Sequence, residues 1–183
     1  YEQVVRQIAR GVDGYISVNV SPRHFRSPDF GDRLLAMFEA HGADPARLRL
    51  EITEVALLDD APRTLRILRT LRQHGILAQL DDFGTGFSAL SYLHRFPISV
   101  LKIDRSFVSG LGAEARPESL ALVRAILALA GTLGIETMAE GVETEEQRSA
   151  LIELGCHLGQ GYLLGRPMAS LEQVGVADAV QAG

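Results

Sequence analysis

The sequence predicts an α/β fold with a parallel sheet. Six short apolar runs alternate along the chain with longer amphipathic runs, which is the pattern of strands connected by helices. The strand runs are apolar nearly throughout, as expected for parallel strands that are covered by helices. The chain has 183 residues and neither an internal repeat nor a low-complexity linker. We therefore expect residues 1–183 to form a single domain with a sizeable core.

The expected elements follow in chain order. The strands are predicted at Tyr15–Val20, Leu48–Thr53, Leu77–Asp82, Val100–Asp104, Ile135–Gly141 and His157–Leu163. The helices between them are predicted at Phe30–His41, Pro62–His74, Glu118–Leu133 and Glu145–Leu154. Tyr1–Arg10 is expected to be the tail of a helix that precedes the first of these strands.

Helix ends carry their usual signals. Asp59 or Asp60 precedes Pro62 and is a plausible N-cap, because Pro is favoured in a first helical turn. Gly75 is a stop signal for the same helix. Thr144 opens a run with capping-box character.

The composition excludes several classes of protein. No apolar run approaches the roughly 20 residues that span a bilayer. The formal charge of −5 means that bulk charge does not attract polyanions, so no nucleic acid polymer is expected as a partner. The lone Cys156 cannot form an internal disulfide and is expected to pack in the core. We expect a cytoplasmic location, including as the cytoplasmic module of a larger membrane-attached protein.

Every predicted strand places a polar side chain at or near its carboxyl end, the edge where catalytic residues gather in α/β folds. One such residue alone would be interpreted as a cap. Six in succession, with acids dominating, favour a site. Clustered carboxylates repel one another and require cations, and oxygen ligands without His or Cys suit Mg²⁺ or Mn²⁺. The residues are Asn19, Glu51, Asp81, Asp82, Lys102, Glu140 and Gln160.

The adjacent Asp81 and Asp82 narrow the chemistry. Neighbours on a regular strand face opposite sides, so both reach one site only where the strand gives way to a loop, here at Phe83–Gly86. A carboxylate that bridges two ions beside a second acid is the arrangement of two-metal phosphoester hydrolysis. Lys102 is either a structural ion-pair partner of these acids or a group that orients water or neutralises a phosphate oxygen.

The motifs at these strand ends resemble the EAL-domain family of bacterial cyclic-di-GMP phosphodiesterases, and they match in order from Asn19 to Pro167. They are Asn19-Val20-Ser21-Pro22, Leu50-Glu51-Ile52-Thr53-Glu54, Asp81-Asp82-Phe83-Gly84-Thr85-Gly86, Leu101-Lys102-Ile103-Asp104, Ala139-Glu140-Gly141-Val142-Glu143 and Gln160-Gly161-Tyr162. The resemblance implies a modified TIM-type (β/α)8 barrel, with about six of the eight strands in this chain. It also implies hydrolysis of cyclic-di-GMP to linear pGpG with two Mg²⁺ or Mn²⁺ ions.

The resemblance also implies a role for each matching residue. It makes Asn19, Glu51, Asp81 and Asp82 metal ligands, with Asp81 bridging. It makes Lys102 and Glu140 the residues that hold and activate the attacking water, with Glu140 as general base. The expected substrate-binding or site-lining residues are Gln160, Asp104, Glu143 and Pro167, and Glu54 is expected to steady the loop that follows Asp82.

The Glu-Ala-Leu signature that names the family does not occur in these residues, because Glu39-Ala40 is followed by His41. In the family its Glu is a metal ligand on the first strand. We expect that strand upstream of Tyr1, and we expect this form alone to be a poor or inactive catalyst. Phe87 and Ala89 are milder departures, outside the expected ligands.

Other functions stay open at this point. The first alternative is a catalytically inactive EAL domain that binds cyclic-di-GMP and regulates a partner. A structural or dimerisation module is the weakest alternative, because it explains none of the acids. The family leads us to expect a homodimer that works with sensory or regulatory domains. The arginines at 63, 66, 69 and 72 are interpreted as a solvated helix surface.

Overall fold

The computed structural model describes residues 1–84, 93–112 and 116–166. Its contacts divide the chain into two compact units. The first unit holds the described residues of 1–81 and 86–99, and the second unit holds those of 82–85 and from 100 onward. Strands β3 (Leu77–Phe83) and β4 (Ile98–Ile103) contribute residues to both units.

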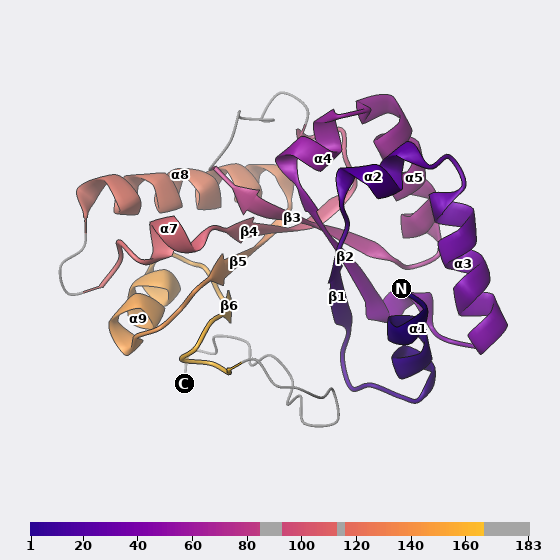
Figure 1. The fold of residues 1–183 in the computed structure, drawn as a ribbon. Helices are drawn as coiled ribbons and strands as arrows, with labels where there is room; N and C mark the ends of the chain where they lie inside the picture. The colour runs from indigo at the N-terminus through magenta and orange to yellow at the C-terminus, as the bar shows by residue number, and fades with distance from the viewer. Residues whose placement is uncertain (85–92, 113–115, 167–183) are drawn as a thin grey trace. The chain divides into compact units, whose positions relative to one another are not determined.

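The first unit alternates helices with parallel strands (Figure 1). Its remaining elements are α1 (Glu2–Ala9), β1 (Ile16–Asn19), α2 (Pro22–Arg26), α3 (Phe30–His41), the 3-10 turn η1 (Pro45–Arg47), β2 (Leu48–Thr53), α4 (Glu54–Leu58) and α5 (Ala61–Gln73). Strand β2 pairs in parallel with β1 on one side and with β3 on the other. Helix α3 packs against both α1 and α5.

The ends of α5 follow the sequence signals. The Asp60 carboxylate accepts from the Arg63 N–H at 3.2 Å, which selects Asp60 rather than Asp59 as the N-cap. At the other end Gly75 takes the left-handed φ of +91°, a conformation that glycine adopts without steric cost. The exposed side chains of Arg66, Arg69 and Arg72 confirm a solvated helix surface.

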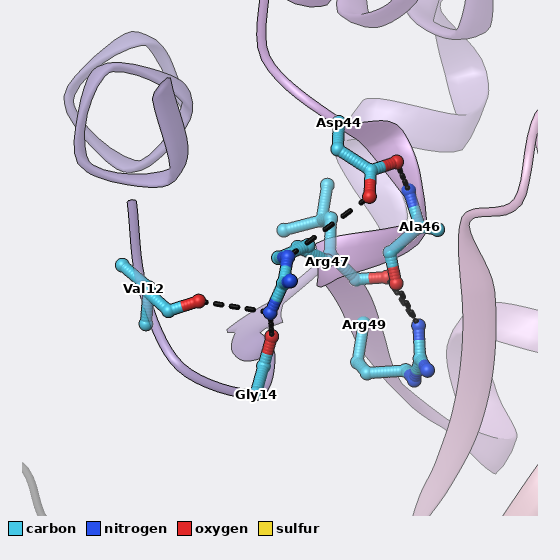
Figure 2. Close-up of polar contacts among 7 residues, drawn as sticks. Val12, Gly14, Asp44, Ala46, Arg47 and Arg49 are labelled. Carbon is cyan, nitrogen blue, oxygen red and sulfur yellow. Dashed lines mark hydrogen bonds and ion pairs between the residues drawn. The ribbon is translucent and has the colours of Figure 1, made fainter. Parts of the chain in front are cut away.

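An arginine clamp holds the segment that leads into β1 against the segment that leads into β2 (Figure 2). One guanidinium nitrogen of Arg47 donates to the carbonyl oxygens of Val12 and Gly14, each at 2.9 Å. The neighbouring Asp44 carboxylate caps the η1 turn by accepting from the Ala46 N–H at 3.0 Å. These contacts join the segment before β1 to the turn before β2.

The second unit continues the alternation with α7 (Arg105–Val108), α8 (Pro117–Leu133), β5 (Glu136–Glu140), α9 (Glu145–Glu153) and β6 (Leu158–Gln160). Strand β5 pairs in parallel with β4 and with β6. Helix α9 begins with the expected capping box, in which Thr144 and Gln147 exchange side chain to backbone hydrogen bonds. Cys156 is fully buried, which confirms a packing role.

All six predicted strands are present among the described residues, in the order β1-β2-β3-β4-β5-β6. Two expectations were wrong in detail. Strands β1 and β2 are not apolar nearly throughout: half-buried and exposed residues alternate along β1, buried and half-buried residues alternate along β2, and one face of each strand is polar. The last strand does not extend from His157 to Leu163, because the chain turns at Gly161, whose carbonyl accepts from the Gly165 N–H at 2.9 Å.

Three short helices, α2, α4 and α7, were not predicted, because five or fewer residues are too short to show a helical period. Helix α1 confirms the helix expected within Tyr1–Arg10. Within the described ranges, none of the helices has the length and apolar character that a membrane crossing requires.

Candidate active site

In the first unit, the polar face of the sheet carries the predicted strand-end residues. The register pairs Asn19 on β1 with Glu51 on β2, and Glu51 in turn with Gln79 on β3. Asp81 lies two residues beyond Gln79 and therefore faces the same side as Glu51. The opposite face carries buried Leu50, Ile52 and Leu80. The sheet thus brings Asn19, Glu51 and Asp81 to one face near the carboxyl ends of three adjacent strands.

Glu54 follows directly after β2 and is the first residue of α4. Its side chain is buried, with 6% exposure. Thr53 begins the helix, and its hydroxyl oxygen accepts from the Ala56 N–H at 3.4 Å. The loop that Glu54 is expected to steady continues into 85–92, which lies outside the described residues.

Asp82 provides the break in strand geometry that the adjacent acids require. Among the described residues, Asp82 is a non-glycine residue whose φ, +52°, lies in the left-handed region. Asp is one of the few residues that tolerate this conformation, which is otherwise typical of strained functional positions. The break therefore begins at Asp82, one residue before the Phe83–Gly86 segment where the sequence predicted it, and Gly84 within that segment also has a positive φ, of +95°.

Within the described residues, the carboxylates of Asp81, Asp82 and Glu140 lie close enough together to hold one metal ion. Asp82 and Glu140 belong to the second unit, and Asp81 is the residue before Asp82 on β3. One carboxylate oxygen of each residue lies within 4.8 Å of one carboxylate oxygen of each of the other two residues. A donor set made of carboxylate oxygens alone suits a hard divalent cation, so these residues fit Mg²⁺ or Mn²⁺.

Lys102 and Glu140 form an ion pair in the second unit. The register places Lys102 on β4 beside Met138 on β5, so that Glu140, two residues further, faces the same side. The Lys102 Nζ lies 2.5 Å from a Glu140 carboxylate oxygen, and their side chains are 3% and 20% exposed. A buried ammonium is costly without such a partner. Glu140 therefore compensates the charge of Lys102 and still reaches the accessible side of the pair.

Gln160 is the register partner of Glu140 on β6 and is exposed. Gly161 fixes where this strand ends. A Cβ on Gly161 would lie 2.2 Å from the backbone N and O of Val142, so only glycine allows this approach. The contact holds β6 against the loop that follows Glu140.

Asp104 and Glu143 lie at the ends of β4 and β5 and have local partners. The Asp104 carboxylate caps α7 by accepting from the Ser106 N–H at 3.0 Å. Glu143 forms an ion pair of 2.7 Å with Arg105, whose stem packs against Gly141. Pro167, Phe87 and Ala89 lie outside the described residues.

Sequence reasoning missed two residues in these surroundings. Gln79 is a buried amide on the polar face of the first unit, and the signal for it was a long polar residue inside the apolar run Leu77–Leu80. Arg105 offered no such signal, because its contact with the loop after β5 depends on the pairing of β4 with β5.

The fold and the strand-end residues define a class of protein, a TIM-type barrel of which this chain contributes six parallel strands. Among solved structures, the PaMucR phosphodiesterase in a c-di-GMP complex is similar, with a TM-score of 0.85 and 39% identity over 94% of this chain and 71% of that chain. BlrP1 from Klebsiella pneumoniae, solved as a manganese and cyclic-di-GMP complex, has a TM-score of 0.78 and 30% identity, covering 91% of this chain and 42% of that chain.

Comparison of sequences leads to the same family. The EAL domain family model matches residues 1–167, and the chain belongs to this family. The chain is 42% identical over 172 residues to the bifunctional diguanylate cyclase/cyclic di-GMP phosphodiesterase MucR of Pseudomonas aeruginosa, covering 91% of this chain and 25% of that protein. It is 40% identical over 153 residues to the cyclic di-GMP phosphodiesterase RocR of the same organism, covering 84% and 38%. The chain therefore spans well under half the length of either relative.

Proposed function

We propose that this chain is the greater part of a hydrolase domain, 1–183, that cleaves one phosphodiester bond of cyclic-di-GMP and releases linear pGpG. The observation that carries the proposal is the carboxylate group of Asp81, Asp82 and Glu140, with the Lys102 ammonium 2.5 Å from Glu140. Membership of the EAL family and relatives named as cyclic di-GMP phosphodiesterases support the substrate.

The proposed cofactor is a pair of Mg²⁺ or Mn²⁺ ions held by Asn19, Glu51, Asp81 and Asp82. The oxygen-only donor set supports these metals, and so does the similarity to a structure solved with manganese. When bound, such ions lower the pKa of a water molecule and neutralise charge on phosphoryl oxygens.

The protein's own contribution begins with Glu140 and Lys102. Glu140 is the proposed general base, because its carboxylate lies on the accessible side of the ion pair and can accept a proton from the attacking water. Lys102 is buried on the other side and holds the carboxylate in place, so that the water is oriented for in-line attack at phosphorus. The proton taken by Glu140 then leaves to solvent, and the free 3′-oxygen of the product is protonated.

The remaining predicted residues have supporting roles in this proposal. Gln160 is proposed to contact substrate, and its position beside Glu140 across the β5–β6 pair supports this role. Asp104 and Glu143 line the site from the loops after β4 and β5, and Pro167 is proposed to contact the nucleotide. Glu54 is proposed to steady the loop after Asp82, for which its burial beside β2 is suitable.

We further propose that the protein acts as a cytoplasmic homodimer joined to sensory or regulatory domains. The greater length of the relatives supports additional domains.

The apolar surface of α4 supports a dimer interface, because Val55 is 71% exposed and Leu58 is 37% exposed. A pocket of about 580 Å³ lies beside Leu58 and is lined by Ala61, Pro62, Leu65, Arg95 and Phe96. Light scattering over a concentration series tests the dimer.

The test of the enzyme proposal is turnover of cyclic-di-GMP with Mg²⁺ or Mn²⁺, followed by chromatography of pGpG. It should be run on the 183-residue chain and on a chain extended at the N-terminus. Asp81→Asn should abolish turnover with little loss of fold, whereas the exposed Asp13→Asn is the matched control and should be fully active. An extended chain that binds cyclic-di-GMP and releases no pGpG would be a receptor, and the enzyme proposal would be lost.

A further inference from the structure

Gln79 is a buried polar residue that the proposed chemistry does not use. It lies in the middle of β3, between Ala78 and Leu80, and its side chain is only 1% exposed. The register places it on the polar face of the first unit, next to Glu51 and two residues before Asp81. Its place in the sheet therefore connects it to two residues that are proposed as metal ligands.

A buried carboxamide must satisfy its hydrogen-bonding groups inside the protein. Transfer of an amide from water into the protein interior without compensating hydrogen bonds is unfavourable. The Gln79 Oε1 accepts from the Ser17 hydroxyl at 3.4 Å, which is a long hydrogen bond. The two N–H donors of the same amide also need acceptors, and an ionised carboxylate accepts several hydrogen bonds at once.

The strand order points to one acceptor. Ser17 is on β1, and β2 lies between β1 and β3. A Gln79 side chain that reaches Ser17 therefore extends across β2 on the face where Glu51 stands, and neighbouring strands are only about 4.8 Å apart. Asn19 is the partner of Glu51 on the other side, so Glu51 stands between two amides in one row of the sheet.

We propose that Gln79 is a positioning residue that donates from its amide NH₂ to the Glu51 carboxylate, with the Ser17 hydroxyl holding the amide oxygen. The hydrogen bond would fix the Glu51 carboxylate toward the carboxyl end of the sheet, where Asp81 follows. The inference rests on the proposed function, because Glu51 is there a metal ligand.

The expected effect is on metal affinity. Removing a hydrogen-bonding partner of a metal ligand typically lowers affinity or activity by about 10–100-fold. Gln79→Met removes the amide while keeping the length and volume of the side chain. Thr64→Val is the matched control, since Thr64 is a fully buried polar residue of the same unit, on α5 and away from the polar face of the sheet.

The experiment is calorimetric titration of the N-terminally extended protein with Mn²⁺ alone, together with thermal unfolding of each variant. Gln79→Met should bind Mn²⁺ at least about 10-fold more weakly, and Thr64→Val should bind like the parent. In turnover assays, Gln79→Met should need more Mn²⁺ for half-maximal activity and should recover most of its rate at saturating Mn²⁺. A residue that only stabilises the fold would not produce this recovery.

Three outcomes would overturn the inference. The first is parental Mn²⁺ affinity in Gln79→Met, even with a lower melting temperature. The second is an equal loss of affinity in Gln79→Met and Thr64→Val. The third is a parent protein that binds no Mn²⁺, which would overturn the metal-dependent function as well. A parent that binds Mn²⁺ and does not hydrolyse cyclic-di-GMP would overturn only the proposed function, and the Mn²⁺ affinities would still decide the role of Gln79.

Discussion

Substitution of Gly161 by Ala tests how β6 is fixed against the loop after Glu140. The added Cβ would lie 2.2 Å from both the N and the O of Val142 and 2.8 Å from its carbonyl carbon. These atoms belong to the backbone, so no rotamer change relieves the overlap. The two segments must separate by at least about 1.2 Å before the Cβ reaches an ordinary contact distance of about 3.4 Å.

The magnitude follows from the hydrogen bonds at this contact. The Val142 N–H donates to the Gln160 carbonyl at 3.0 Å, and the Leu163 N–H donates to the Val142 carbonyl at 3.1 Å. A separation of about 1.2 Å breaks both bonds, and a buried group left unpaired costs about 1–3 kcal/mol. We therefore expect Gly161→Ala to lower the free energy of unfolding by about 2–4 kcal/mol. For a chain of this size the melting temperature should fall by about 5–15 °C.

The assay is thermal unfolding followed by circular dichroism, with two glycine controls. A Cβ on Gly165 or on Gly131 meets no atom within 4 Å, and neither residue has a positive φ. Gly165→Ala should therefore be nearly neutral, and Gly131→Ala, within α8, should stabilise by about 0.5–1 kcal/mol. A Gly161→Ala variant that melts within about 1 °C of the parent would refute the reasoning, because the backbone contact would then have room for a methyl group.

Three further predictions concern the arginine clamp, the buried thiol and the buried ammonium. Arg47→Met removes both hydrogen bonds of the clamp, to Val12 and Gly14. Calorimetry should show a free energy of unfolding lower by about 1–2 kcal/mol, a loss kept small because the Arg47 side chain is 44% exposed. An unchanged melting temperature would show that the clamp does not stabilise the fold. Burial raises the pKa of the Cys156 thiol, so iodoacetamide at pH 8 should label unfolded but not native protein, and rapid native labelling would contradict the buried position. Lys102→Met should lower kcat by at least about 100-fold, and a variant that keeps a tenth of the parental kcat would exclude the proposed role of Lys102.

Much of the fold could be predicted because each strand and helix of sufficient length carries its own pattern. The bounds of β2 and α3 match the prediction to the residue, and those of β3 differ only by Phe83. The shortened β6 could not be predicted, because its end depends on a backbone contact between Gly161 and Val142 that no local pattern encodes. The polar faces of β1 and β2 could have been predicted, because apolar and polar residues alternate in the sequence along both strands; the expectation of apolar strands treated the six runs together and missed this alternation.

The candidate site was predictable as a set of residue types at strand ends, but not as a geometry. The sequence indicated that Asp81 and Asp82 need a break between them, and the left-handed φ of Asp82 provides it one residue earlier than expected. The sequence left open whether Lys102 pairs with an acid or acts on water. The 2.5 Å contact with Glu140 identifies the partner, which only the register of β4 and β5 could reveal.

The exposure of the two partners favours a catalytic over a purely structural pair. Replacement of a buried ion pair by well-packed apolar residues is often neutral or stabilising, so the fold itself does not require Lys102 and Glu140. The carboxylate is the more accessible partner, since the side chain of Lys102 is 3% exposed and that of Glu140 is 20% exposed. Lys102 therefore lies beside a carboxylate that is the more accessible member of the pair and has an oxygen within 4.8 Å of one of Asp82, an arrangement that supports the proposed role of Glu140 as general base.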